Sequence, residues 1–274
     1  MNKRILIFGK TGLLGSELSK YFKKKNYKVF SYSRKNFDYI NNTNLLISKL
    51  EKVKPDFILN AAAITDEKIC KKNKKLCYLT NTYFPEKLGM IAKKNKYVLI
   101  HFSTDDIFNN KKKRLNLIQD IPNPSSLYGR TKLLSEIKLK KNKFAIILRL
   151  PHVFSLKKKG FFKNMDIKLK KGKKIFLHNY FFSPILLSDI CAFINKMIKN
   201  KIFFEYISKK KVIHLSNSIR ISRFDFFKSL YKKKKYQKLI FKSKKIKIND
   251  YSKVNKGLEC NIKRKYKFNK INLI

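Results

Sequence analysis

The chain has 274 residues, of which 43% are hydrophobic, and it carries a formal net charge of +50 at pH 7. This length and apolar content fit one enzyme-sized unit, with either one large core or a nucleotide-binding domain and a smaller companion. No apolar run reaches the roughly 18 residues that cross a bilayer, and the N-terminus enters a strand pattern directly. We therefore expect a cytoplasmic protein without membrane association.

The positive charge would ordinarily indicate a polyanionic partner such as nucleic acid. However, only 8 of the 67 basic residues are Arg, and the lysines recur in short runs along the whole chain. A nucleic-acid reader favours the bidentate arginine fork and concentrates its charge on one face. We expect solvated surface lysines and no specific nucleic-acid partner. The alternative, a protein that binds nucleic acid through its charge, predicts binding that weakens steeply with salt.

Cysteine and histidine are too dispersed to suggest a metal site. Neither residue type shows metal-ligand spacing, and the cysteines do not form the framework of a small disulfide-rich domain. We expect no metal, and free thiols at all four cysteines: Cys70, Cys77, Cys191 and Cys260.

Up to residue 150, short apolar runs rich in β-branched residues alternate with longer amphipathic stretches, which is typical of repeated βαβ units. The predicted strands are Arg4–Phe8, Lys28–Ser33, Phe57–Asn60, Tyr97–Ser103 and Ala145–Leu150. The clearest helices are Leu13–Lys24 and Ser126–Lys141. Near-continuous apolar runs suit parallel strands that are covered on both faces. The predicted class is α/β, with a Rossmann-type doubly wound parallel sheet.

After Pro151 the pattern is less regular and predicts a smaller C-terminal α/β lobe. The predicted elements are a helix at Asp189–Lys199, a strand at Val212–Leu215 and a helix at Arg223–Lys232. We expect residues 1–150 to form a nucleotide-binding domain. Residues 151–274 are expected to bind mainly substrate, with some segments returning to the first domain.

A glycine-rich turn joins the first predicted strand to the first predicted helix. Gly9 permits the tight turn, Gly12 lets a pyrophosphate approach the backbone, and Gly15 allows close packing of helix on strand. The spacing G-x-x-G-x-x-G differs from the usual G-x-G-x-x-G, but its strand–turn–helix context disfavours a turn without a ligand. The residues expected to bind a dinucleotide here are Gly9, Lys10, Thr11, Gly12, Leu13, Leu14 and Gly15.

The end of the second predicted strand indicates which cofactor is bound. Arg34 and Lys35 stand where an NAD-preferring site places an acidic residue against the ribose 2′-hydroxyl. A cation pair favours a 2′-phosphate, so we expect NADP(H), with NAD(H) as the alternative; both cations could also be ordinary surface charges. Asp38 is expected to contact the adenine. Three residues closing the third strand are expected to lie against the cofactor: Asn60, Ala61 and Ala62.

A candidate catalytic pair lies at the start of a predicted helix, where Tyr128 and Lys132 are one turn apart on the same face. An ammonium group and a nicotinium ring nearby would lower the tyrosine pKa from about 10 toward neutrality. The fourth strand ends in Ser103 and Thr104, which places a hydroxyl beside this tyrosine. Y-x-x-x-K alone is common in a lysine-rich chain, but its co-occurrence with the glycine turn and the strand-end S-T-D is not.

These motifs, in this order, resemble the extended short-chain dehydrogenase/reductase family, and within it the sugar-nucleotide reductases of the dTDP-4-dehydrorhamnose reductase type. The resemblance covers nearly the whole chain: Gly9–Gly15, Asn60–Ala63, Ser103–Asp105, Ile107–Phe108, Tyr128–Gly129, Lys132, Glu136, Ser183–Pro184, Asp189 and Ile221–Phe224. It implies that Tyr128 donates a proton, Lys132 holds the nicotinamide ribose and Thr104 bonds the substrate carbonyl. The implied activity is NADPH-dependent reduction of the C4 keto group of a nucleotide-activated deoxysugar, for cell-surface polysaccharide synthesis.

Three departures from the family pattern leave the substrate open. Asp106 replaces a tyrosine, and because related dehydratases carry an acidic pair there, Asp105 and Asp106 support a dehydratase or epimerase as an alternative. The short chain argues against it, and Asp106 is expected to be a loop or cap residue. His152 replaces a tryptophan and is expected to pack or to contact substrate, and Ser155 replaces a glycine.

Another alternative is a non-catalytic regulatory NADP-binding subunit, because a fold and its site can outlive an activity. Intact Thr104, Tyr128 and Lys132 argue against that alternative. The sequence leaves a homodimer open.

Overall fold

A computed structural model provides the structure, which describes residues 3–34, 38, 40–109, 114–155, 161–177, 180–231, 233–242, 257–262 and 266. Lys35 and Lys232, both named in the sequence predictions, lie outside the described residues. None of the helices within these ranges is long and apolar enough to span a bilayer. Nor do the same ranges contain three or more His, Cys, Asp or Glu side chains grouped to hold a metal ion.

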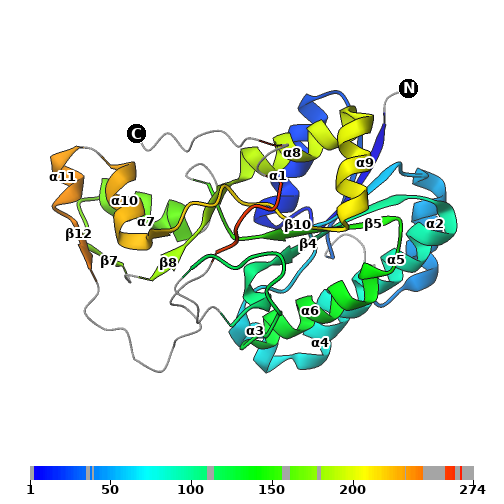
Figure 1. Cartoon of the computed structure of the whole chain (residues 1–274), viewed down its shortest axis with the longest axis horizontal. Coiled ribbons are helices and arrows are strands. Elements are labelled where there is room, and N and C mark those ends of the chain that lie inside the picture. Colours follow the sequence, from blue (N-terminus) through cyan, green and yellow to red (C-terminus); the bar gives the residue numbers. More distant parts are fainter. Residues whose placement is uncertain are drawn as a thin grey trace.

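Six parallel strands form the central sheet, in the order β10-β5-β4-β3-β1-β2 (Figure 1). The strands are β1 (Arg4–Phe8), β2 (Lys28–Tyr32), β3 (Phe57–Asn60), β4 (Val98–Thr104), β5 (Ala145–Leu150) and β10 (Val212–His214). The predicted α/β class with a Rossmann-type doubly wound parallel sheet is confirmed. The chain order reverses at β1, which lies between β2 and β3, and ligands of such sheets bind at this switch point.

Helices cover both faces of the sheet, with α1, α8 and α9 on one side and α2, α5 and α6 on the other (Figure 1). The helices that belong to these layers and their connections are α1 (Leu13–Lys24), α2 (Thr43–Val53), α3 (Glu67–Lys72), α4 (Lys74–Tyr78), the π-helix η1 (Leu79–Tyr83), α5 (Phe84–Asn95), the 3₁₀ turn η2 (Asp105–Ile107), α6 (Leu127–Lys140), α8 (Leu187–Lys199) and α9 (Lys201–Lys210).

The first strand explains why the sheet needs both layers. Side chains alternate across a strand, so Ile5 and Ile7 join the core beneath α1 and α8, whereas Leu6 and Phe8 join the core beneath α2 and α5. All four side chains are fully buried. A strand that is apolar on both faces is stable only when both faces are covered, which is what the near-continuous apolar runs predicted.

A separate aromatic cluster forms the C-terminal lobe, which we define as the described parts of 161–182 and 221–242. Its elements, with the two short strands that lead to it, are β6 (His152–Phe154), α7 (Phe161–Lys170), β7 (Ile175–Leu177), β8 (Phe181–Phe182), β9 (Pro184–Leu186), β11 (Ile221–Ser222), α10 (Arg223–Leu230), α11 (Lys234–Gln237) and β12 (Ile240–Lys242). The ring of Phe162 stacks on Phe227 and meets Phe226 edge to face. This lobe lies at the left of Figure 1, beside the sheet.

The element predictions hold closely. The five predicted strands, and the helices at Leu13–Lys24 and Ser126–Lys141, are each found with ends within one residue. The predicted helix at Asp189–Lys199 begins two residues earlier, and β10 ends one residue before Leu215.

The expectation of free thiols is wrong for two cysteines. Cys70 of α3 and Cys77 of α4 form a disulfide, with their Cα atoms 5.2 Å apart. The short turn between these helices brings residues seven apart in sequence within bonding reach, which their linear spacing did not indicate. Cys191 and Cys260 are both buried.

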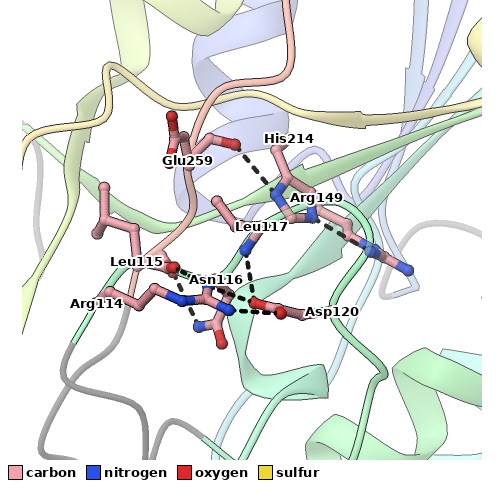
Figure 2. A network of polar contacts seen from close by, with 9 residues as sticks. Arg114, Leu115, Asn116, Leu117, Asp120, Arg149, His214 and Glu259 are labelled. Atoms are coloured by element: carbon pink, nitrogen blue, oxygen red, sulfur yellow. Dashed lines mark hydrogen bonds and ion pairs between the residues drawn. The ribbon is translucent and has the colours of Figure 1, made fainter.

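A buried polar network joins residues distant in the sequence at the β10 edge of the sheet (Figure 2). Arg149 of β5 donates from Nη2 to Glu136 of α6 at 2.7 Å and from Nη1 to Nε2 of His214 at 3.2 Å. His214 Nδ1 faces the backbone oxygen of Glu259 at 3.2 Å, so the proton lies on Nδ1 and Nε2 accepts. Burial and the Arg149 charge lower the pKa of His214 to about 3.

The same network holds a loop and a segment near the C-terminus together. Arg114 forms two hydrogen bonds of 2.8 Å with the carboxylate of Asp120, which also accepts from the backbone of Leu117. Asn116 forms backbone hydrogen bonds with Gly257 and Glu259. Residues 257–259 are therefore attached to the sheet through His214 and to the loop through Asn116.

We predict that Arg149→Leu destabilises the protein by about 3–5 kcal/mol, because Glu136 would remain buried without its cation. The double variant Arg149→Leu/Glu136→Leu is expected to lose less stability than Arg149→Leu, because it leaves no buried carboxylate unpaired. Urea unfolding followed by circular dichroism measures both free energies. A double variant that is less stable than Arg149→Leu would contradict this account of the ion pair.

Candidate functional site

A cavity of about 400 Å³ lies where the carboxyl ends of β1, β3, β4 and β5 meet, next to the switch point. Its size suits a small ligand. The lining residues are Gly12, Leu13, Leu14, Asn60, Ala61, Ala62, Ala63, Thr65, Phe102, Ser103, Thr104, Asp105, Asp106, Tyr128, Leu150, Pro151, His152 and Val153. The structure therefore brings together most of the predicted site residues, from four separate motifs. A larger cavity, of about 820 Å³, lies between α6 and β10 and contains none of them.

The glycine turn is shaped by close approaches of the backbone. Gly9 has a φ of +87°, and a Cβ there would lie 2.6 Å from the carbonyl group of Ala61. A Cβ on Gly15 would lie 2.2 Å from the backbone oxygen of Gly9. Helix α1 begins after Gly12 and has no acidic residue in its first turn. Its N-terminal amides and the positive end of its dipole therefore suit an anion.

Arg34, one of the two residues predicted to select the cofactor, follows the end of β2. Arg34 is exposed, and its charge contributes to lowering the pKa of Asp38. The largest cause of that lowering is the hydrogen bond from the Asn41 side chain, and the Asp38 carboxylate also accepts from the amides of Ile40 and Asn41. Asp38 thus stabilises the turn before α2.

Two hydroxyl groups face each other inside the cavity, because Thr104 closes β4 and Tyr128 begins α6. The Thr104 hydroxyl donates to Asp105 Oδ1 at 3.3 Å and accepts from the amide of Asp106 at 3.2 Å. The Thr104 side chain also lies close enough to Tyr128 to influence the pKa of its phenol. Asp106 therefore sits in a turn capped by Thr104, as the expectation of a loop or cap residue stated.

The pKa of Tyr128 is raised, which corrects the expectation that it is lowered. Burial is the largest cause, the charges of Asp106 and Asp105 add to it, and the interaction with the Thr104 side chain opposes them. Lys132 does not offset this, because its amino group faces the ring of His101 instead. Tyr128 is consequently protonated at neutral pH, which is the state a proton donor needs.

Lys132 is 1% exposed and lies on the sheet side of α6. Its Nζ is 2.9 Å from Nε2 of His101. Burial lowers its pKa to about 7, and the neighbouring carboxylate of Glu136 partly opposes that shift. Sequence reasoning missed His101, although it stands three residues before Thr104 on the same strand.

His152 contributes one wall of the cavity. Its ring meets the rings of Phe162 and Phe182 edge to face, at centroid distances of 5.3 and 5.7 Å. It therefore packs against the C-terminal lobe, as expected, and also lines the cavity, while its contact with substrate stays a prediction.

Glu67, which the sequence analysis also missed, fixes the N-terminus of α6. Its carboxylate accepts hydrogen bonds of 3.1 Å from the backbone amides of both Leu127 and Tyr128. Ser126 accepts a third from Gly129 at 2.9 Å. Glu67 lies 61 residues before Tyr128, and no local pattern links the two.

We predict that Glu67→Ala lowers the free energy of unfolding by about 1–2 kcal/mol, because two helix amides lose a charged acceptor. Glu67→Gln, which retains one acceptor oxygen, should lower the free energy of unfolding by roughly half as much. Glu86→Ala is the matched control, since its ion pair with Lys138 is partly exposed and is worth less than about 1 kcal/mol. Equal losses in urea unfolding for Glu67→Ala and Glu86→Ala would contradict the capping role.

A doubly wound parallel sheet, a glycine turn at its switch point, and a Tyr–Lys pair beside the Thr that ends β4 define a Rossmann-type short-chain dehydrogenase/reductase. The family described as "RmlD substrate binding domain" matches residues 3–256, and the chain belongs to this family. The resemblance identified from the motifs is confirmed.

The sequence identity between this chain and its relatives is moderate. The dTDP-4-dehydrorhamnose reductase of Aggregatibacter actinomycetemcomitans is 27% identical over 241 residues, covering 86% of this chain and 81% of the relative. Methionine adenosyltransferase 2 subunit beta of Xenopus tropicalis is 32% identical over 159 residues. This match covers 56% of this chain and about half (47%) of that protein. The dTDP-4-dehydrorhamnose reductase of Bacillus anthracis has the same fold, with a TM-score of 0.78 at 22% identity over 89% of this chain and 85% of that chain.

Proposed function

We propose that the chain reduces the C4 keto group of a nucleotide-activated deoxysugar with NADPH, as a dTDP-4-dehydrorhamnose reductase does, for polysaccharide synthesis. One observation carries the proposal: Thr104 and Tyr128 line the same cavity as the glycine turn, and the Thr104 side chain acts on the phenol of Tyr128. The names of the relatives support the substrate class, since the reductase of A. actinomycetemcomitans matches over most of both chains.

The residues present fit a dinucleotide. The N-terminus of α1 would receive the pyrophosphate, and the close contact of Gly9 with Ala61 shapes the turn beside it. Arg34, with Lys35, would bind the 2′-phosphate, and Lys132 would hold the nicotinamide ribose. We therefore propose NADP(H), with NAD(H) as the alternative; the B. anthracis reductase is itself in complex with NADP.

The proposed reaction divides the work between the cofactor and three side chains. When bound, NADPH supplies the hydride that reduces the carbonyl carbon. Tyr128 donates its proton to the carbonyl oxygen as charge develops there, and Thr104 donates a hydrogen bond to that oxygen. Lys132, when protonated, stabilises the phenolate that Tyr128 becomes. The product is an alcohol, and Tyr128 regains its proton from solvent.

We propose the same division between the lobes as the sequence indicated, with residues 1–150 binding the cofactor and 151–274 mainly the substrate. A third cavity, of about 350 Å³, lies in the C-terminal lobe. Lys168, Lys174 and Arg223 line it together with apolar side chains, among them Phe176. Three cations beside an apolar surface suit the diphosphate and base of a sugar nucleotide.

Two alternatives remain distinguishable. A dehydratase or epimerase would use the acidic pair Asp105 and Asp106, whose charges both act on Tyr128. A regulatory NADP-binding subunit is favoured by the 32% identity to the adenosyltransferase subunit. If this chain were such a regulatory subunit, it would bind NADPH but would reduce no keto-sugar. A cytoplasmic location, a homodimer and the lack of a specific nucleic-acid partner belong to the proposal.

We predict that Tyr128→Phe lowers the rate of NADPH oxidation with dTDP-4-keto-6-deoxy sugars by about 10²–10⁴-fold, because the proton donor is lost. NADPH affinity should stay within about twofold, since the phenyl ring keeps its place. Absorbance follows the rate, and nucleotide fluorescence follows binding. Tyr83→Phe, on an exposed ring, is the matched control. Undiminished turnover in Tyr128→Phe would refute its role as acid.

Arg34→Ala should weaken NADPH binding about tenfold and leave NADH binding unchanged, because only NADPH carries the 2′-phosphate that the guanidinium would bind. Arg130→Ala, which removes another exposed arginine from α6, is the control. Fluorescence titration gives both dissociation constants. If Arg34→Ala weakens both nucleotides equally, Arg34 does not select the cofactor.

A further inference from the structure

His101 is buried at the centre of a polar chain and has no role of its own in the proposed reaction. It is 0% exposed, and its ring contacts three side chains from three elements. Nδ1 lies 3.2 Å from Nδ2 of Asn60 on β3, while Nε2 lies 3.0 Å from Oγ of Ser135 and 2.9 Å from Nζ of Lys132, both on α6.

The neighbours of His101 determine which ring nitrogen carries the proton. The side-chain oxygen of Asn60 accepts from the amide of Ala62 at 3.2 Å, so the NH₂ group of Asn60 points at the ring. Nδ1 must therefore accept, and in a neutral imidazole the proton then lies on Nε2. The hydroxyl of Ser135 donates to the backbone oxygen of Lys132 at 2.7 Å, which leaves Oγ free to accept from Nε2–H.

This tautomer gives Lys132 no acceptor. An ammonium group has three donors and no lone pair, so it cannot bond to a nitrogen that already carries a proton. An uncharged amine has a lone pair and can share the Nε2–H with Ser135 Oγ in a three-centre hydrogen bond. A doubly protonated ring is disfavoured because Nδ1 faces the Asn60 NH₂ group, and burial holds the pKa of His101 well below its usual range.

We propose that His101 is a positioning residue, which, fixed in the Nε2–H tautomer by Asn60 and Ser135, holds the Lys132 side chain in place as an uncharged amine. The proposed reaction needs the ammonium form beside the Tyr128 phenolate. His101 thereby sets the pH range in which Lys132 can assist. The inference about activity rests on the proposed function, whereas the inference about the charge state of Lys132 does not.

Other charged groups around this pair favour the ammonium form. Glu136 acts on Lys132 directly, but its carboxylate is already paired with Arg149. Further titratable groups on the elements that pack here include Tyr128 of α6, Asp105 and Asp106 of η2, and Glu67 of α3, while Arg130, Lys138 and Lys140 also lie on α6. The lowered pKa of Lys132, about 7, agrees with the hydrogen-bond argument, which does not depend on it.

The first experiment is nuclear magnetic resonance on the wild-type protein without ligands. The ¹⁵N shifts of His101, identified by its loss in His101→Gln, should report a proton on Nε2 and no titration between pH 5 and about 8. The ¹³Cε resonance of Lys132, identified in Lys132→Met, should titrate near pH 7. A proton on Nδ1 of His101, or a Lys132 pKa near the ordinary 10.4 or so, would overturn the proposal.

The second experiment changes the acceptor. His101→Gln can place an amide oxygen toward Lys132 and an amide NH₂ toward Ser135, so it should raise the pKa of Lys132 by at least about one unit. His101→Leu has a similar volume without polar atoms and should not raise it. If both variants, or neither, raise the pKa, burial alone sets it and the proposal fails. Thermal melts establish that each variant is folded.

The proposal also predicts the direction in which the pH dependence of activity should change. Because the lysine is protonated below its pKa, kcat/KM of the wild type should fall as pH rises above about 7, and the fall should move to higher pH in His101→Gln. An unmoved pH limb in an active His101→Gln enzyme would count against the catalytic consequence. If the resonance results hold while no keto-sugar is reduced by the wild type, the proposed function fails and the role of His101 stands.

Discussion

The site depends on the alignment of parallel strands, which all end at the same edge of the sheet. Strands β1, β3, β4 and β5 lead to Gly12, Asn60, Thr104 and Pro151, which line one cavity although they span more than half the chain. The alignment is maintained by close backbone packing, above all where Gly9 passes Ala61 with no room for a Cβ. Widening that contact would separate the proposed nucleotide-binding turn from the hydroxyls that would act on the substrate.

Helix α6 connects this edge to the core, and its buried face is unusually polar. Tyr128, Lys132, Ser135 and Glu136 point toward the sheet, at spacings of three and four residues that place them on one side of the helix. Each finds a partner on η2, β4 or β5, so the polar groups are not left unsatisfied. The two buried networks, around His101 and around Arg149, therefore hold the helix in register and at the same time carry the chemistry.

The charge of the protein takes on a different meaning once burial is known. Among the described lysines, Lys132 is the one classed as buried. The others that the structure describes lie at least partly in solvent, where an ammonium group is well hydrated and has little effect on its neighbours. Burial thus lowers the pKa of Lys132 to about 7 and also lowers that of the partly buried Lys211, although the composition is dominated by this residue type.

Sequence alone determined the sheet, the glycine turn and the Tyr128–Lys132 pair, because hydrophobic periodicity and motif spacing are local properties that a linear pattern contains. It could not provide Glu67 or the partners of His101, since these contacts join residues about 30 to 60 positions apart. It also gave the wrong direction for the pKa of Tyr128 and the wrong state for Cys70 and Cys77. Burial and proximity decide proton affinity and thiol pairing, and only the tertiary structure creates either one.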